Sequence, residues 1–282
     1  MYSITFNFIT RGFILLFGLF GNVMVMIVFS AKSFKNFPSR NIYRILVVFD
    51  SILLISSISH EFLGNFGISL TSELLNKMFS YILVAFLTPY LLVFISIEKF
   101  ITIRFPTNKI IKRNKFQTIL VFALMACNLI FFHPIFYLNA YKTNNTNNQT
   151  SLEFEASKTF RVTSLMYNLG LPFILMMVFS ILLIQTILKS RLRIIRLTNQ
   201  HDRNRLKKDI QFSFSSIFLN IFYLILVLPY YVYLFLGGDM KADLSVNVFM
   251  SLFYINAFDH FYILFCFNSV FRRKVLVLFR LK

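Results

Sequence analysis

The first long apolar segment of the chain is residues 12–31, GFILLFGLFGNVMVMIVFSA, which contains no charged residue. A bilayer hydrocarbon core about 30 Å thick requires about 20 apolar residues of helix, at a rise of about 1.5 Å per residue. The segment is too long for the apolar core of a secretory signal peptide and has no clear small-residue cleavage site. We therefore predict an uncleaved membrane-spanning helix.

Six further segments satisfy the same length requirement, and polar, turn-rich stretches separate them. They predict an all-α fold, a seven-transmembrane helix bundle with a short amphipathic eighth helix. The expected division is a short N-terminus at 1–11, the bundle at 12–267, and the eighth helix with the tail at 268–282. The expected spans are 12–31, 42–60, 78–103, 117–138, 164–188, 211–235 and 245–267.

The composition excludes several other classes of protein. The 282 residues are 57% hydrophobic and only 14% charged, whereas an ordinary soluble domain is about 45–50% apolar and about 25% charged. We therefore expect no soluble enzyme. A nucleic-acid binder is also excluded, because it needs its charges on a solvated face, and long stretches here carry none. The two cysteines, Cys127 and Cys266, give no disulfide framework and no zinc-ligand spacing.

The formal charge of +18 is concentrated in alternate loops. The loops 32–41, 104–116 and 189–210, the tail 268–282, and the adjoining span ends carry 23 of the 29 Lys and Arg residues. Because basic loops stay in the cytoplasm, the N-terminus is expected outside and the C-terminus inside. We expect a multi-pass protein of the plasma membrane, with the lipid bilayer as a partner.

Two potential glycosylation sites lie in a predicted outer loop. Asn144-Asn145-Thr146 and Asn148-Gln149-Thr150 both match the acceptor pattern. We expect glycans on Asn144 and Asn148, although a loop rich in Asn and Thr also produces such triplets by chance.

Several polar residues lie in the middle of predicted spans. Asn22, Asp50, Asn256, Asp259 and His260 come from three different spans. Charged groups at bilayer depth are costly and usually mark functional sites. The favoured interpretation is one shared, hydrated network. The alternative is that each group only bonds a backbone carbonyl or packs at a helix crossing.

Short motifs follow one another along the whole chain. They are Gly21-Asn22 in the first span, Leu46 to Asp50 in the second, Glu98-Lys99-Phe100 at the end of the third, Pro134, Pro172 and Pro229 in the fourth to sixth, His260 to Leu264 in the seventh, and Phe271-Arg272-Arg273 after it. In order and spacing they resemble the rhodopsin-like G-protein-coupled receptors, and the seventh-span motif is closest in style to invertebrate neuropeptide-type receptors. The resemblance implies a receptor that transmits an extracellular peptide or small-molecule ligand to a heterotrimeric G protein.

The chain also departs from that family pattern. Lys99 replaces the family's arginine, which loses the planar guanidinium and keeps a point charge. The sixth span lacks the usual Trp before Pro229, and the cysteines of the typical extracellular disulfide are absent. These departures bear on how the protein is activated.

The resemblance implies an activation switch made of Glu98, Lys99, Phe100, Asp209, Pro229 and His260. In it, Lys99 and Asp209 would form an ion pair in the inactive state, and the sixth helix would swing outward about Pro229. The alternative is an interfacial lysine that reaches water beside Glu98.

A sodium ion is the one cofactor that the resemblance implies. Its site would comprise Asn22, Asp50, Thr88, Asn256 and His260, although an imidazole is a poorer ligand for a hard cation than the family's asparagine.

The resemblance also places a ligand pocket between the outer halves of the spans, lined by Tyr81, Tyr230, Tyr231 and Tyr254. Aromatic, hydroxyl-bearing walls suit a peptide or a polar aromatic ligand. The same tyrosines could instead be interfacial anchors or core packing.

The alternative function is a seven-span chemosensory receptor or ligand-gated channel subunit that does not act through G proteins. Known proteins of that type have the opposite orientation, which the charge distribution disfavours. No catalytic constellation indicates an enzyme.

Overall fold

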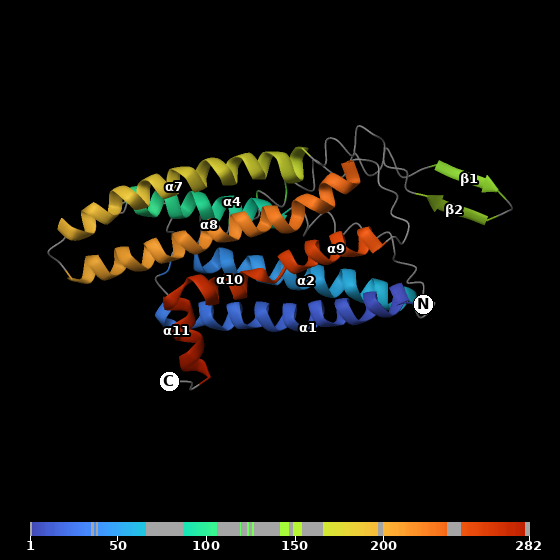
Figure 1. The fold of residues 1–282 in the computed structure, drawn as a ribbon, viewed down its shortest axis with the longest axis horizontal. Helices are drawn as coiled ribbons and strands as arrows, with labels where there is room; N and C mark the ends of the chain where they lie inside the picture. Colours follow the sequence, from blue (N-terminus) through green and yellow to red (C-terminus); the bar gives the residue numbers. More distant parts are fainter. Residues whose placement is uncertain are drawn as a thin grey trace.

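The computed structural model describes residues 2–34, 37, 39–65, 87–105, 119, 123, 126, 142–146, 149–153, 166–196, 200–235 and 244–279. Its long helices lie side by side along one common axis (Figure 1). They are α1 (Tyr2–Ser30), α2 (Arg40–Asn65), α4 (Leu87–Arg104), α7 (Leu171–Arg196), α8 (Gln200–Phe235), α9 (Leu244–Asn256) and α10 (Asp259–Phe267).

Five short elements complete the described chain. They are the 3-10 turn η1 (Lys32–Phe34), the π-helical turn η3 (Met166–Gly170), the strands β1 (Lys142–Thr146) and β2 (Gln149–Glu153), and the final helix α11 (Ser269–Leu278). Six of the seven predicted spans correspond to described helices, with α9 and α10 together forming the last. The predicted span 117–138 lies outside the described residues, apart from three isolated helical positions.

Among the described residues, three helices and one bent pair of helices are long and apolar enough to cross a bilayer. Ile9–Ser30, Leu171–Ser190 and Leu206–Tyr233 have mean hydropathies of 2.4, 2.4 and 2.0. The pair Asn247–Asn256 and Asp259–Phe267 passes the same test as one span bent by 56°. The helix α1 begins at Tyr2, so it extends over most of the segment 1–11 that was expected to precede the bundle.

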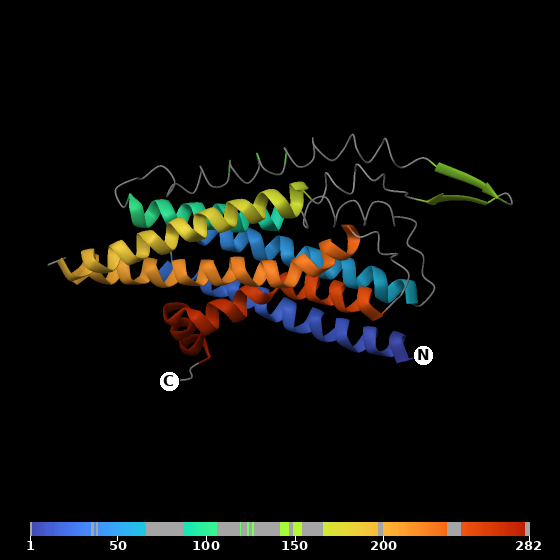
Figure 2. The same cartoon turned by 45° about the horizontal axis from the view of Figure 1, so that its top comes forward.

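The two strands were not predicted. Within the polar stretch after the fourth predicted span, β1 and β2 pair antiparallel, from Lys142 opposite Glu153 to Thr146 opposite Gln149. The hairpin lies at the end of the bundle where the N-terminus lies (Figures 1 and 2). The backbone groups of this polar segment thus pair within the hairpin itself.

The helix α1 approaches its neighbours closely at two glycines. A Cβ on Gly18 would lie 2.6 Å from Leu54 Cδ1 and 3.2 Å from Phe258 Cδ1, and a Cβ on Gly21 would lie 3.2 Å from Phe261 Cβ. Small residues allow membrane helices to pack backbone to backbone. The sequence Gly18 to Gly21 therefore fixes α1 against α2 and against the junction of α9 and α10.

That junction is a break in the last span at Ala257 and Phe258, where no proline is present. A broken helix leaves backbone groups without their usual partners. One of them, the Ala257 carbonyl, accepts a hydrogen bond of 3.1 Å from the Asn22 side-chain amide of α1. The break is thus supported by a side chain from a distant part of the sequence.

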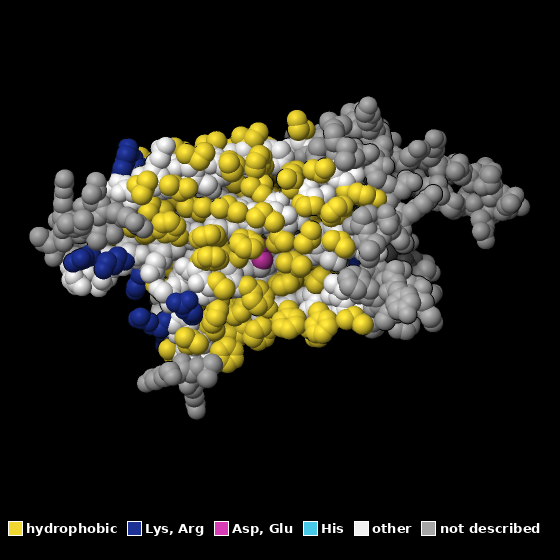
Figure 3. Space-filling view, viewed as in Figure 1, with side chains coloured by type: hydrophobic (Ala, Val, Ile, Leu, Met, Phe, Trp, Pro, Cys, Tyr) yellow, Lys and Arg dark blue, Asp and Glu magenta, His cyan; other side chains and the backbone are white. Residues whose placement is uncertain are grey.

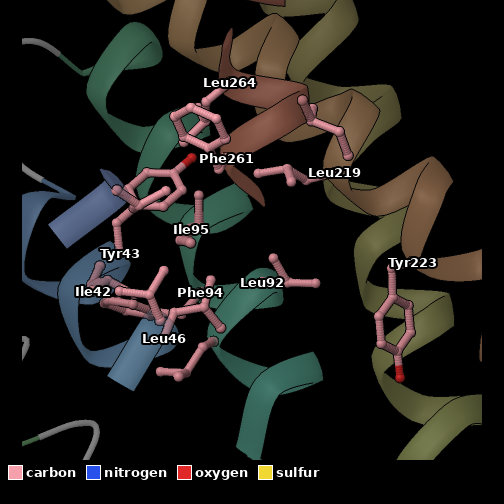
Figure 4. Close-up of a cluster of buried hydrophobic side chains, with 14 of the residues drawn as sticks. Ile42, Tyr43, Leu46, Leu92, Phe94, Ile95, Leu219, Tyr223, Phe261 and Leu264 are labelled. Carbon is pink, nitrogen blue, oxygen red and sulfur yellow. The ribbon is translucent and has the colours of Figure 1, made fainter. Parts of the chain in front are cut away.

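Apolar side chains from α2, α4, α8 and α10 form the centre of the bundle. Figure 4 shows part of this core, with Tyr43 from α2, Ile95 from α4, Leu219 from α8 and Leu264 from α10. Each helix buries residues on the faces that meet its neighbours, and the buried apolar side chains form one large central cluster with two smaller clusters beside it.

The last helix, α11, is the predicted eighth helix. Asn268 caps its start, since the Asn268 Oδ1 accepts a 3.0 Å hydrogen bond from the Phe271 N–H. Phe271 and Val275 are buried against the bundle, whereas Arg272 and Arg273 are exposed. The helix turns away from the long axis where α10 ends (Figures 1 and 2).

Candidate functional site

Two of the predicted polar residues are in direct contact in the middle of the bundle. Thr88 Oγ1 of α4 donates a 2.9 Å hydrogen bond to Asp50 Oδ1 of α2. His260 Nδ1 of α10 lies 3.0 Å from Asp259 Oδ1 and 3.9 Å from Asp50 Oδ2. Asp50, Asp259 and His260 are all buried. The structure therefore brings an imidazole between two buried carboxylates.

Asn22 and Asn256 belong to the same part of the molecule. Both side chains are buried, and Asn22 bonds the carbonyl at the break between α9 and α10. The Oδ1 atoms of both, together with Asp50 Oδ2, have no hydrogen-bond partner within the part of the chain that the structure describes. Buried acceptors usually have a hydrogen-bond partner, so these three oxygens are the atoms of the site with acceptor capacity to spare.

The donor set suits a cation only in part. Oxygen atoms of Asp50, Asn22 and Asn256 are the kind of ligand that hard cations prefer. His260, however, offers nitrogen, and its imidazole already lies close to the carboxylate that would carry most of the charge. Among the described residues, no group of three or more His, Cys, Asp and Glu side chains has the arrangement of a metal site.

A second polar site lies at the end of α4, around Glu98 and Lys99. Glu98 accepts hydrogen bonds from Ser39, just before α2, and from Thr102 Oγ1 at 3.3 Å. Lys99 Nζ lies 3.4 Å from Glu98 Oε2. Glu98 is 0% and Lys99 1% exposed. Burial of two charges at a helix end is expensive unless they are paired, and here they pair with each other.

Aromatic rings complete the surroundings of Lys99. Its Nζ lies 4.0 Å from the ring centroid of Phe37 and 5.8 Å from that of Phe212. A cation over an aromatic face is attracted to the negative quadrupole of the ring. The alternative of a lysine that reaches water is wrong for this structure, because the side chain is buried.

The predicted ion pair between Lys99 and Asp209 is not formed. The carboxylate paired with Lys99 is that of Glu98. The helix α8 turns Phe212, three residues after Asp209, toward the lysine instead. Asp209 is half-buried, and its backbone carbonyl accepts a 2.8 Å hydrogen bond from Ser213. The face of α8 that meets α4 is therefore aromatic where the prediction required it to be acidic.

The other members of the predicted switch lie apart from this pair. Phe100 is half-buried, with its ring centroid 6.1 Å from that of Phe179 on α7. Pro229 lies inside α8, where it removes one backbone hydrogen bond. His260 belongs to the mid-bundle cluster already described.

Sequence reasoning missed a polar junction between three helices. Asn220 of α8 donates two hydrogen bonds of 2.9 Å, to Ser96 Oγ of α4 and to Ser180 Oγ of α7. Ser216 of α8 lies 3.4 Å from the same Ser96 oxygen. All four side chains are buried. The sequence signal for this junction was the polar residue Asn220 in the middle of an apolar span.

The predicted pocket residues lie toward the end of the bundle where α1 begins. Tyr230, Tyr231 and Tyr254 are all buried, and Tyr81 lies outside the described residues. The Tyr230 ring lies 5.7 Å from Tyr231 and 5.2 Å from Phe253. The contact of Phe253 with Tyr230 joins α9 to α8 at this level, and the Tyr254 ring lies 5.9 Å from Phe253 on the same helix.

A buried arginine close to these tyrosines was also missed. Arg11 of α1 is 6% exposed, donates to Asn247 Oδ1 of α9 at 3.4 Å, and lies 5.6 Å from the Tyr254 ring centroid. It precedes the first apolar segment in the sequence, where a charge at a span end is unremarkable. The N-terminal end of the bundle therefore holds a cation as well as aromatic hydroxyl groups.

The chain resembles a solved structure over nearly its whole length. It matches the crystal structure of squid rhodopsin with a TM-score of 0.77 at 14% sequence identity, and the match covers 97% of this chain and 84% of the squid chain. No protein-family model and no curated protein sequence matches it. The chain therefore shares the fold of this rhodopsin, and the residues that the structure describes supply six of the seven expected spans and the helix α11 that follows them.

Proposed function

We propose that this protein is a G-protein-coupled receptor that transmits the binding of an extracellular peptide or small molecule to a heterotrimeric G protein. The observation that carries the proposal is the rhodopsin-like bundle over 97% of the chain. Within that bundle, Glu98 and Lys99 are buried at the end of α4 and between elements that would have to separate for a partner to reach them.

The distribution of charge supports the orientation. Exposed Lys and Arg side chains gather at one end of the molecule, and apolar side chains cover the middle (Figure 3). The described part of this basic end is formed by η1, the end of α4, the first turns of α8, and α11. Basic segments remain on the cytoplasmic side of a membrane. The basic end would face the G protein inside the cell, and the N-terminus would lie outside the plasma membrane.

The glycan sites fit the same orientation. Asn144 belongs to β1, and β1 lies at the end of the bundle opposite the basic end (Figure 1). Asn148 lies outside the described residues. Glycans on both would mark this end as extracellular, because glycosylation occurs on the lumenal side of the secretory pathway.

The ligand would bind among Tyr230, Tyr231 and Tyr254, with Tyr81 as a further wall. Buried tyrosines give apolar area and a hydroxyl group for orientation. A ligand that binds better when α8 is displaced would shift the population toward that state, with Pro229 as the weak point of the helix.

A sodium ion in the mid-bundle site remains part of the proposal. Asp50, Thr88, Asn22 and Asn256 would hold it, and a bound cation would offset the buried carboxylate charge. The unsatisfied Asp50, Asn22 and Asn256 oxygens support this assignment, whereas the imidazole of His260 competes with it.

The test is a G-protein dissociation assay in cells that express the full chain, run against a panel of neuropeptides and small polar aromatic ligands. A ligand-dependent signal that is absent from untransfected cells would support the receptor. An N-terminal tag on intact cells separates the alternatives. Labelling of the tag without permeabilisation fits the receptor, whereas labelling only after permeabilisation fits an inverted channel subunit and would refute the proposal.

A further inference from the structure

We propose that Phe37, in the linker between α1 and α2, is a lid that covers the Lys99 ammonium and holds α8 closed against α4. This lid is an autoinhibitory contact built into the fold. Its effect on signalling rests on the proposed function, but the lid itself does not.

The contacts place Phe37 at the centre of the closed end. Its ring centroid lies 4.0 Å from Lys99 Nζ and 4.2 Å from the ring centroid of Phe212. Lys99 belongs to α4 and Phe212 to α8, so one side chain of the linker bridges the two helices. The ring also lies 5.8 Å from Phe29 of α1, which anchors the linker to the bundle.

The charge of Lys99 makes this contact more than packing. Lys99 is 1% exposed, and the carboxylate beside its ammonium is that of Glu98, whose oxygens also accept hydrogen bonds from Ser39 and Thr102. The ring of Phe37 replaces part of the water that a lysine would otherwise bind. If α8 moves away, Phe212 leaves the ring of Phe37, and water can enter beside Lys99. Opening of the lid and displacement of α8 are therefore coupled.

Phe34 provides a matched control in the same linker. Its ring lies 6.0 Å from Phe212 and 5.3 Å from Phe29, so it shares the aromatic cluster with Phe37. The described rings over the Lys99 ammonium, however, are those of Phe37 and Phe212. A purely structural role would give the same result at both positions, whereas the lid requires an effect at Phe37 alone.

The first experiment measures the exposure of Lys99 without any G protein. The full-length protein in lipid nanodiscs is treated with an amine-reactive reagent, and labelling of Lys99 is compared by mass spectrometry with labelling of the exposed Lys207 and Lys208. We expect Lys99 to be protected in the wild type and in Phe34→Leu. In Phe37→Leu, loss of the cation–π contact should raise its labelling about 2- to 30-fold.

A further variant guards against simple loss of folding. Phe37→Tyr keeps the aromatic face and should keep Lys99 protected, and thermal melting should be similar for the Phe37 and Phe34 leucine variants. Equal labelling in wild type and Phe37→Leu, or equal increases in the two leucine variants, would overturn the lid.

The second experiment measures ligand-free G-protein dissociation at equal surface expression. We expect Phe37→Leu to raise it above wild type, with Phe34→Leu and Phe37→Tyr near wild type. If Lys99 becomes exposed in Phe37→Leu and no variant changes the signal, the lid stands and the proposed function fails. If signalling rises without exposure of Lys99, the lid fails and the proposed function stands.

Discussion

Replacing Asn220 with Leu should favour displacement of α8 away from α4, which we call the open state. The Asn220 amide is the donor of two interhelical hydrogen bonds of 2.9 Å, one to Ser96 of α4 and one to Ser180 of α7. In membrane proteins such bonds contribute about 0.6 kcal/mol each on average. Loss of both removes about 1.2 kcal/mol, which corresponds to roughly an 8-fold change in an equilibrium constant. Since Lys99 is buried in this arrangement, we take it to be the closed state that these bonds stabilise.

Ligand-free G-protein dissociation at equal surface expression measures this shift. Ser215→Ala is the matched control, because Ser215 Oγ donates only to the Gln211 carbonyl of its own helix, at 3.1 Å. Ser180→Ala should show about half of the effect, and adding it to Asn220→Leu should change little further, because the shared bond is already lost. A wild-type basal signal in Asn220→Leu, or an equal rise in Ser215→Ala, would refute the reasoning.

Three further predictions concern packing, ions and topology. Gly18→Leu should lower the free energy of unfolding by about 1–3 kcal/mol, because a Cβ at this position would lie 2.6 Å from Leu54 Cδ1. Gly12→Leu is the control and should melt like the wild type, because a Cβ there would meet nothing within 4 Å. Equal melting of the two variants would contradict the close packing of α1. Replacing choline with sodium, at a sodium concentration ten times the dissociation constant of the site, should raise the free energy of unfolding of the wild type by about 1.4 kcal/mol. The same replacement should leave Asp50→Asn unchanged. Identical melting of the wild type in the two salts would argue against a sodium site. Asn144→Gln and Asn148→Gln should each remove one glycan and increase mobility on a denaturing gel; a chain from mammalian cells that glycosidase treatment leaves unshifted would contradict the proposed outer face.

The bundle was predictable because its cause is local. Apolar segments long enough for a bilayer can be read without knowing their neighbours, and this was enough to predict the spans that α1, α2 and α8 now occupy. The structure confirms the eighth helix as well, since its cap at Asn268 and its buried Phe271 both lie within the predicted segment. The hairpin of β1 and β2 escaped prediction because a polar stretch with few apolar residues has no period to read.

The candidate site was less predictable because its contacts depend on helix rotation and on the path of a linker. The contact between Asp50 and Thr88 joins positions 38 residues apart, and only the relation of α2 to α4 brings them together. The partner of Lys99 was predicted wrongly for the same reason. A small rotation of α8 decides whether Asp209 or Phe212 faces α4, and nothing in the local sequence fixes that rotation.

The bend in the last span depends on contacts from elsewhere in the chain, because Ala257 and Phe258 at the bend include no proline. A proline would leave its helix permanently one N–H group short. Here the Asn22 side-chain amide of α1 donates to the Ala257 carbonyl at 3.1 Å. Asp259 and His260 follow directly after this joint, and Asp259 Oδ1 lies 3.0 Å from His260 Nδ1. The hydrogen bond from Asn22 therefore links the position of α1 to that of the buried carboxyl group and imidazole, although the two residues that it joins are 235 positions apart in the sequence.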